Sequence, residues 1–299
     1  MEHASFHRVT SRRGTARARA RFSVVGYRAS VARSAQLALL LGLAAVGAGC
    51  GLVYDLSKLG PGADDAGSGD AADAAVVDAV PPTCPSRRGS PMIGAASFCI
   101  DARETTNAQY AAYLADTKKT GKRPTLPPTC NFKEELTPGS VVPAEAELPV
   151  RNVDWCDALS YCLWADKRLC GKVGGGGLRR IDATDPAASE WARACTKGGT
   201  RPLPYGPTYE AGRCHVPGDA AAPLPAASQC AGGLDGLLDM VGNVAEWIDA
   251  CETADGEFAE CEVLGGSFLS SGAEATCASI APAARSAKRP DQGIRCCGP

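Results

Sequence analysis

Residues 239–247 read DMVGNVAEW, and this stretch decides the fold because four other motifs keep a fixed order around it. Upstream lie PVRNVDWCDA at 149–158 and WADKRL at 164–169, and downstream lie LGGSF at 264–268 and GIRC at 293–296. Each of these short motifs is weak evidence when taken alone. Five of them in one order over about 150 residues are not expected by chance.

The ordered motifs resemble the formylglycine-generating enzyme family, also called sulfatase-modifying factors, over residues 90–297. The resemblance implies that family's α+β fold, an elaborated C-type-lectin-like domain with little regular secondary structure. Many Gly and Pro residues, short periodic runs and many Cys agree with a loop-rich domain stapled by disulfides. We therefore expect one such domain over residues 84–299.

The first 49 residues are expected to be a lipoprotein-type signal peptide. Residues 1–34 carry eight Arg and a single acid, and residues 35–49 form an apolar run rich in Leu and Ala. A 15-residue helix rises only about 22 Å, less than the roughly 30 Å of a hydrocarbon core, so an export signal is favoured over a spanning helix. The small residues before Cys50 resemble a bacterial lipobox, which implies a lipid on Cys50; ordinary cleavage is the alternative.

Residues 50–83 are expected to be a flexible acidic tether behind the lipidated Cys50. Residues 51–83 hold six Asp, one Lys and many Ala, Gly and Pro, a composition that cannot bury a core. The predicted location is the bacterial cell envelope, with the chain exported and held by its lipid to a membrane. Gly51 lacks the acidic signal associated with retention in the inner membrane, which favours the outer membrane.

The cysteine count predicts an oxidising compartment. Fourteen Cys remain after Cys50, an even number that is typical of structural disulfides in an exported chain. The folded part carries 22 basic and 26 acidic residues, and no basic cluster is apparent in its sequence. Nucleic-acid binding, which needs a clustered basic surface, is therefore not expected.

A few regular elements are predicted from local patterns. Residues 98–101 alternate apolar and polar side chains, as a half-buried strand does. Helices are predicted over 108–114 and 155–165, with Leu159, Cys162 and Leu163 turned inward in the second, and a short helical turn follows Ser189. Each begins after residues that cap helix N-termini, namely Thr105-Thr106-Asn107, Asp154 and Ser189.

The histidine inventory excludes several metal sites and makes a serine triad improbable. His215 is the only His after the predicted signal peptide, so two-His-one-carboxylate iron sites and two-His or three-His zinc sites are impossible within one chain. A serine triad would have to use His215, and no nucleophile elbow is present. We interpret His215 as a loop residue.

The segment Asp239–Glu246 is a candidate calcium site, because a hard cation takes several oxygens from a compact turn. The family resemblance implies carboxylate oxygens from Asp239 and Glu246 and backbone carbonyls from Gly242 and Val244. The alternative is a tight Gly-Asn turn before a buried Trp247, with no ion. A second family calcium site uses an Asn near the position of His215, so that site is not expected here.

The copper site of active family members is incomplete in this chain. The resemblance implies two Cys spaced Cys-x4-Cys after the GGS turn, where soft thiolates bind copper(I). Here the first position is Ser270 and the second is Ala275. With a two-residue insertion Cys277 would be the second thiolate and would act in catalysis beside Ser270. Copper is expected only under that alternative.

The resemblance also implies one disulfide, between Cys162 and Cys296. The adjacent Cys297 is expected to have a different partner, because a bridge between neighbouring residues is strained. Cys251 and Cys261 flank a short acidic segment and could close a loop. The remaining pairings stay open.

Three functions remain compatible with the sequence. The first is a tethered binding domain for a protein or glycan ligand that lacks oxidase activity. The second is a copper oxidase that converts a client Cys, such as that of a sulfatase, to formylglycine. The third is an accessory subunit of an envelope complex. The missing thiolate pair favours the first and third over the second.

Overall fold

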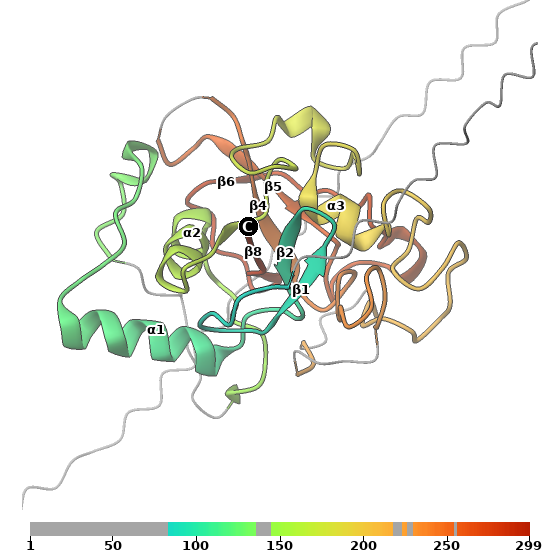
Figure 1. Cartoon of the computed structure of the whole chain (residues 1–299), viewed down its shortest axis with the longest axis horizontal. Coiled ribbons are helices and arrows are strands. Elements are labelled where there is room, and N and C mark those ends of the chain that lie inside the picture. Colours follow the sequence, from blue (N-terminus) through green and yellow to red (C-terminus); the bar gives the residue numbers. More distant parts are fainter. Residues whose placement is uncertain (1–82, 136–144, 218–222, 226–229, 254–255) are drawn as a thin grey trace, which may run out of the picture. The chain divides into compact units, whose positions relative to one another are not determined.

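The computed structural model describes residues 83–135, 145–217, 223–225, 230–253 and 256–299. The predicted signal peptide, Cys50 and nearly all of the predicted tether lie outside these residues. The described part consists of short helices and strands joined by long loops, so the predicted α+β, loop-rich fold is confirmed (Figure 1). In chain order its elements are β1 (Met92–Ala95), β2 (Phe98–Asp101), α1 (Asn107–Thr120), η2 (Pro128–Cys130), α2 (Trp155–Trp164), β3 (Arg168–Leu169), η4 (Arg180–Asp182), α3 (Glu190–Cys195), β4 (Ala245–Cys251), β5 (Glu260–Leu264), η5 (Gly272–Glu274), β6 (Ala283–Ala284), β7 (Gln292–Gly293) and β8 (Cys296–Gly298).

Two four-stranded sheets form the centre of the domain. The first has the order β1-β2-β8-β3 and is antiparallel throughout. The second has the order β6-β5-β4-β7, and only the pair β4–β7 is parallel. Strand β8, at the end of the described chain, pairs with β2 near its beginning, so the two ends of the domain are joined in one sheet.

Strand β4 is buried on both faces and lies between two apolar cores. Its Ile248 belongs to the core that includes Trp191, Met240 and Leu264. The preceding Trp247 points the opposite way, as strand alternation requires, into the core of α1 and α2. Both side chains are fully buried. The decisive motif therefore contains the first three residues of the strand that joins the two cores.

The predicted helix starts are confirmed in atomic detail. At α2, Asp154 Oδ1 accepts from the Asp157 amide at 2.9 Å and Asp157 Oδ2 accepts from the Asp154 amide at 3.2 Å, which is a capping box. Thr106 and Gln109 form the same reciprocal arrangement at α1. The hydroxyl of Ser189 accepts from the Ala192 amide at the start of α3.

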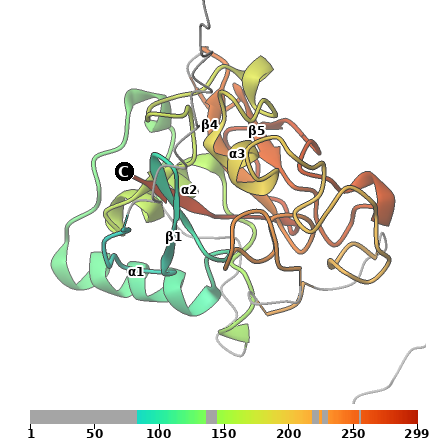
Figure 2. The same ribbon diagram turned by 45° about the vertical axis from the view of Figure 1, so that its right-hand side comes forward.

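The extents and faces of the helices differ in two respects from the prediction. Helix α1 continues to Thr120, beyond the predicted end at 114, and ends at Gly121, whose φ of 66° favours glycine. On α2, Cys162 is buried as predicted, but Leu159 and Leu163 are only half-buried. The two helices lie together on one side of the domain (Figures 1 and 2), and α2 turns Tyr161 towards the tyrosines of α1.

All fourteen cysteines of the described part form disulfides. Cys162 bonds to Cys296, the pairing that the family resemblance implies, and Cys297 has a different partner, Cys170. Cys251 and Cys261 close a short loop. The other bonds are Cys84–Cys99, Cys130–Cys156, Cys195–Cys277 and Cys214–Cys230. A domain with this many disulfides is suited to an oxidising compartment.

Within the described residues, no helix is both long and apolar enough to cross a membrane.

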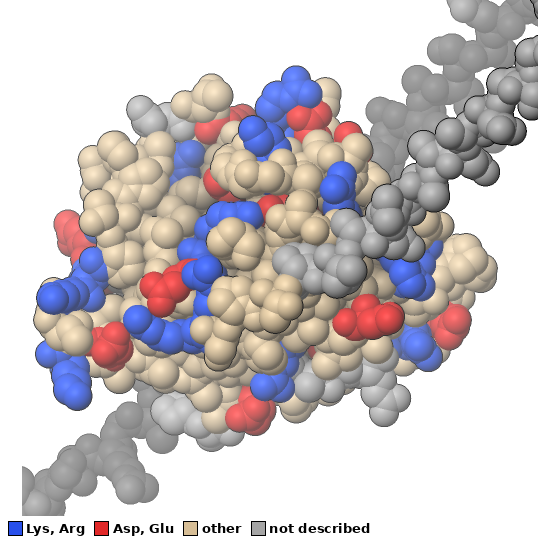
Figure 3. Space-filling model, viewed as in Figure 1, with Lys and Arg blue, Asp and Glu red and all other residues tan. Residues whose placement is uncertain are grey.

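On the face viewed in Figure 3, acidic and basic side chains are interspersed, and no continuous basic surface covers it.

Candidate functional site

The predicted calcium turn lies at the entrance to β4 and is tightly packed. Gly242 has a φ of 81°, and a Cβ at this position would lie 2.7 Å from the carbonyl oxygen of His215. Only glycine fits here without a shift of the backbone. Asn243 also has a positive φ, and its Oδ1 accepts from the Leu224 amide at 2.8 Å. Its side chain therefore orders the neighbouring loop.

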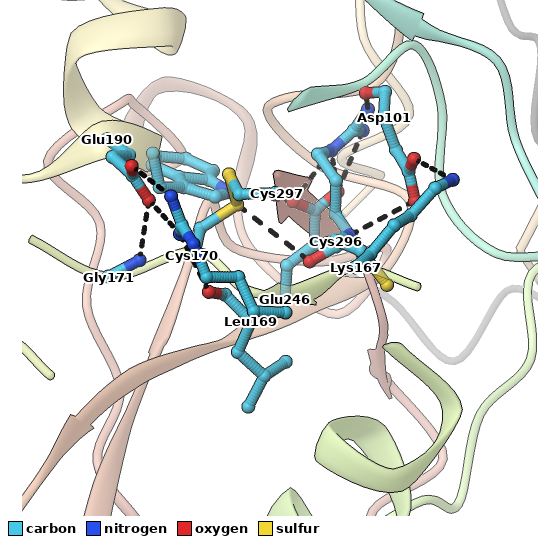
Figure 4. Close-up of a disulfide and its surroundings, with 12 residues drawn as sticks. Asp101, Lys167, Leu169, Cys170, Gly171, Glu190, Glu246, Cys296 and Cys297 are labelled. Carbon is cyan, nitrogen blue, oxygen red and sulfur yellow. Dashed lines mark hydrogen bonds and ion pairs between the residues drawn. A yellow bond between two sulfur atoms is a disulfide. The ribbon is translucent and has the colours of Figure 1, made fainter. Parts of the chain in front are cut away.

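Glu246 lies at the centre of a buried polar network (Figure 4). Both of its oxygens accept from Arg295 Nε at 2.9 Å, and Oε2 also accepts from Trp191 Nε1 at 2.6 Å. Arg295 is completely buried and Glu246 is 1% exposed. Two of the five motifs meet here, because Glu246 belongs to DMVGNVAEW and Arg295 to GIRC. The backbone oxygens of Asp101 and Leu238 accept the remaining hydrogen bonds of Arg295.

A second buried ion pair adjoins this network. Lys167, from the motif WADKRL, donates from Nζ to Asp101 Oδ1 at 2.5 Å and to the carbonyl of Ser90 at 2.7 Å. Asp101 Oδ2 accepts from the amide of Cys296 at 3.2 Å. Burial raises the pKa of Asp101 to about 6, although Lys167 opposes the shift. In Figure 4 the Cys170–Cys297 disulfide lies between this pair and Glu190, so covalent and ionic links share one region.

Glu104 is a member of the site that sequence reasoning missed. It lies in the loop after β2, and its carboxylate accepts from Asn243 Nδ2 at 2.6 Å and from the Val244 amide at 3.0 Å. Burial raises the pKa of Glu104 well above its ordinary value, and the charges of Asp239 and Glu246 raise it further. An acid next to the capping residues Thr105-Thr106 reads as part of a helix start, so the sequence carried no separate signal for this role.

The buried charges around the turn are unbalanced. Glu104, Asp239 and Glu246 are each at most 1% exposed, and all three charges act on Arg295. Burial lowers the pKa of Arg295, but Glu246 and then the other two acids raise it overall. Three carboxylates facing one guanidinium leave an excess of negative charge, which protonation or a bound cation would offset.

This charge excess fits a calcium ion, with Asp239 and the carbonyls of Gly242 and Val244 as oxygen ligands. Glu246 fits less well, because both of its oxygens already accept from Arg295. Among the residues that the structure describes, no group of three or more His, Cys, Asp or Glu side chains is arranged to hold a metal. A site here would therefore depend on backbone oxygens.

The two positions of the family's copper ligands are brought together by the GGS turn. A Cβ placed on Gly266 would lie 2.9 Å from Ser270 Oγ and 3.2 Å from Ala275 Cβ, so both positions flank one point. Ala275, rather than Cys277, thus occupies the place beside Ser270. Cys277 is bonded to Cys195 in the apolar core. Under the copper alternative Cys277 would be a catalytic thiolate; the structure instead places its sulfur in a disulfide, as the even cysteine count favours.

A polar cavity of about 380 Å³ opens beside Ser270. Ser267 Oγ donates to Asp291 Oδ2 at 3.0 Å, and Ser270 Oγ accepts from the Ser267 amide at 2.9 Å. Gln292 also lines this cavity and is 2% exposed. Its Oε1 accepts no hydrogen bond within the described part of the chain. The cavity is therefore lined by a residue with a buried acceptor that has no donor among the described residues.

His215 does not line the cavity beside Ser270. It is half-buried and lines a larger cavity of about 720 Å³ with Tyr209, Arg213 and Gly272. Its carbonyl oxygen accepts from the Asn243 amide, so its backbone supports the DMVGNVAEW turn.

The family whose model is described as "Sulfatase-modifying factor enzyme 1-like domain" matches residues 85–298. The chain is 30% identical over 133 residues to "Inactive C-alpha-formylglycine-generating enzyme 2" of Bos taurus, which covers 39% of this chain and 37% of that protein. It is 27% identical over 132 residues to "Formylglycine-generating enzyme" of Mus musculus, covering 39% of this chain and 31% of that protein. These matches span well under half of the relatives' length.

Solved structures are also similar to the chain. PvdO from Pseudomonas aeruginosa matches with a TM-score of 0.48 and 17% identity, covering 71% of this chain and 90% of that one. CarF matches with a TM-score of 0.45 and 22% identity, covering 68% and 86%. The family match spans the whole described domain, from Pro85 to Gly298. The chain therefore belongs to the sulfatase-modifying factor family.

Proposed function

We propose that this domain is a binding or accessory module of the family and does not generate formylglycine. One observation carries the proposal: Ser270 and Ala275 occupy the paired positions beside Gly266, while Cys277 is bonded to Cys195.

The residues beside Gly266 do not fit copper(I). This soft ion prefers thiolates, whereas the hydroxyl of Ser270 is a hard donor that stays protonated at neutral pH. Ala275 has no donor atom. Every cysteine of the described domain is in a disulfide, so none supplies a thiolate.

The cavity beside Ser270 is the proposed ligand surface. The buried Oε1 of Gln292 needs a donor, and a buried acceptor without one is costly. Asp291 and Glu274 add acceptors, and Arg289 adds a donor. Peptide amides and sugar hydroxyls have the donors that such a wall selects, which supports a protein or glycan ligand.

The absence of oxidase activity is tested by a thiol census. Alkylation of the denatured, unreduced mature protein is expected to modify none of the cysteines from Cys84 to Cys297. A client peptide containing Cys should remain unoxidised when it is incubated with the protein, copper and oxygen. A free Cys277 that copper(I) protects from alkylation, together with peptide oxidation, would overturn the proposal.

A matched variant provides the control for that experiment. The variant Ser270→Cys/Ala275→Cys places two thiols on either side of Gly266 and, with these thiols kept reduced, is expected to bind copper(I). The control Ser271→Cys/Ala275→Cys should bind copper(I) more weakly. Titration with a chelator that competes for copper(I) measures the affinity of each variant. Equal binding by the two variants would show that positions 270 and 275 are not a specific pair.

We further propose that calcium stabilises the DMVGNVAEW turn through Asp239, Gly242 and Val244. Removing calcium with EGTA is expected to lower the Tm by at least about 3 °C, since a ligand bound only to the folded state stabilises it. Asp239→Ala should abolish the EGTA effect, and Asp182→Ala, which changes an acid on η4, should preserve it. The site is excluded if EGTA leaves the wild-type Tm unchanged or if its effect survives in Asp239→Ala.

We also propose that a lipid on Cys50 anchors the domain to a membrane of the bacterial envelope. The disulfides support an oxidising compartment, and the lipobox-like sequence before Cys50 supports the anchor. Wild-type protein is expected to partition into the detergent phase of Triton X-114, and Cys50→Ser into the aqueous phase. Mass spectrometry of the mature N-terminus shows the acyl chains directly, and an unmodified Cys50 would contradict the anchor.

A further inference from the structure

A basic hollow lies away from the cavity beside Ser270. It has a volume of about 360 Å³ and is lined by the cationic side chains Lys197, Arg201 and Arg213. Asp235 is the single acidic residue in its lining. Within the described part of the chain, none of the three cations forms a salt bridge with a carboxylate. The hollow therefore carries a net positive charge.

Arg201 is held in a fixed orientation at the wall. Its Nη2 donates to the carbonyl oxygen of Gly233 at 2.6 Å. Its Nε is buried and donates to no acceptor among the described residues. A buried guanidinium N–H without an acceptor is costly, so a ligand or water must supply one.

Two further contacts order other parts of the wall. The guanidinium of Arg213 lies over the ring of Tyr205, 5.7 Å from its centroid. The Cys214–Cys230 disulfide links the residue after Arg213 to the residue before Ala231, so it ties two walls of the hollow together. A ligand would meet preorganised groups and would lose little affinity to their ordering.

Two glycines in the wall of the hollow pack closely against neighbouring backbone. A Cβ on Gly232 would lie 2.1 Å from the carbonyl oxygen of Pro204, and one on Gly233 would lie 2.3 Å from that of Ala194. Both glycines have positive φ, which adds to the cost of any side chain. The wall of the hollow therefore requires glycine at both positions.

We propose that this hollow binds a phosphate or sulfate group of a larger ligand. Two arginines and a lysine converging on one space suit an oxyanion, because guanidinium and ammonium donors form charge-assisted hydrogen bonds to it. The hollow exceeds the size of the oxyanion alone, and Tyr205, Pro204 and Leu234 supply apolar surface for the group that carries it. A sugar phosphate or sugar sulfate has this combination. The site is independent of the cavity beside Ser270.

The test compares anions at equal ionic strength on the full mature protein. Inorganic phosphate or sulfate is expected to raise the Tm above its value in chloride, and glucose 6-phosphate or glucose 6-sulfate should bind more tightly than the inorganic ion. Binding of phosphate and glucose 6-phosphate would identify the ligand as a phosphate ester, and binding of sulfate and glucose 6-sulfate would identify it as a sulfate ester. Either result supports the site. If no oxyanion stabilises the protein more than chloride, the proposal is overturned.

Charge variants locate the binding. Arg213→Gln and Lys197→Gln are each expected to weaken oxyanion affinity about tenfold, because each removes a charge-assisted contact. Both side chains are exposed, so neither substitution should disturb folding. The matched controls Arg123→Gln and Lys118→Gln remove equivalent charges near α1 and should bind as the wild type does. Unchanged binding in both hollow variants would place the oxyanion elsewhere and overturn the assignment.

Discussion

Replacing Arg295 with Met is expected to destabilise the domain by about 3–5 kcal/mol, the usual cost of removing one partner of a buried ion pair. The guanidinium donates to Glu246 and to the carbonyls of Asp101 and Leu238. Without it, Glu246 would lose its cationic partner while it remains buried near Glu104 and Asp239. The free energy of unfolding in urea measures the loss, and the disulfide-bonded protein is used throughout.

Two further variants separate the loss of charge from the loss of volume. Adding Glu246→Gln to Arg295→Met removes one unopposed carboxylate and should recover part of the stability, because the two residues are coupled. Arg179→Met removes an exposed arginine, and it should change stability by less than about 0.5 kcal/mol. A loss below about 1 kcal/mol in Arg295→Met would show that the buried network does not stabilise this fold.

Removing the Cys162–Cys296 and Cys170–Cys297 disulfides together is expected to cost at least about 4–5 kcal/mol. The two bonds span nearly the same stretch of chain, 134 and 127 residues, so either one alone keeps that long loop closed in the unfolded chain. All four sulfurs are buried, so the variant Cys162→Ala/Cys170→Ala/Cys296→Ala/Cys297→Ala also loses packing. Urea unfolding of the oxidised protein measures the change.

The control removes a disulfide that closes a short loop. Cys84→Ala/Cys99→Ala opens a bond with a sequence separation of 15 residues, for which the same loop-entropy relation gives about 3 kcal/mol. The difference between the two variants therefore measures what closing the long loop adds to the stability of the domain. An equal or larger loss in the short-loop variant would show that strain or packing, rather than chain entropy, dominates in this domain.

The candidate site was only partly visible in the sequence. Asp239, Gly242, Val244 and Glu246 lie within one short segment, and the structure keeps them on one turn and strand. Glu104 reaches the same turn from 139 residues away, and no local pattern marks it. Ser270 was identified from its spacing after GGS, but only the packing against Gly266 shows that Ala275, and not Cys277, is its counterpart.

The sequence by itself determined the features that depend on near neighbours. The caps Asp154 and Ser189 act on amides three residues away, so residue types suffice to place these helix starts. An even cysteine count similarly predicts disulfides without specifying pairs. Only the tertiary structure decided the charge balance around Arg295 and the Cys195–Cys277 bond. Those contacts join segments far apart in the chain, and their energies depend on burial, which arises only when both cores are packed.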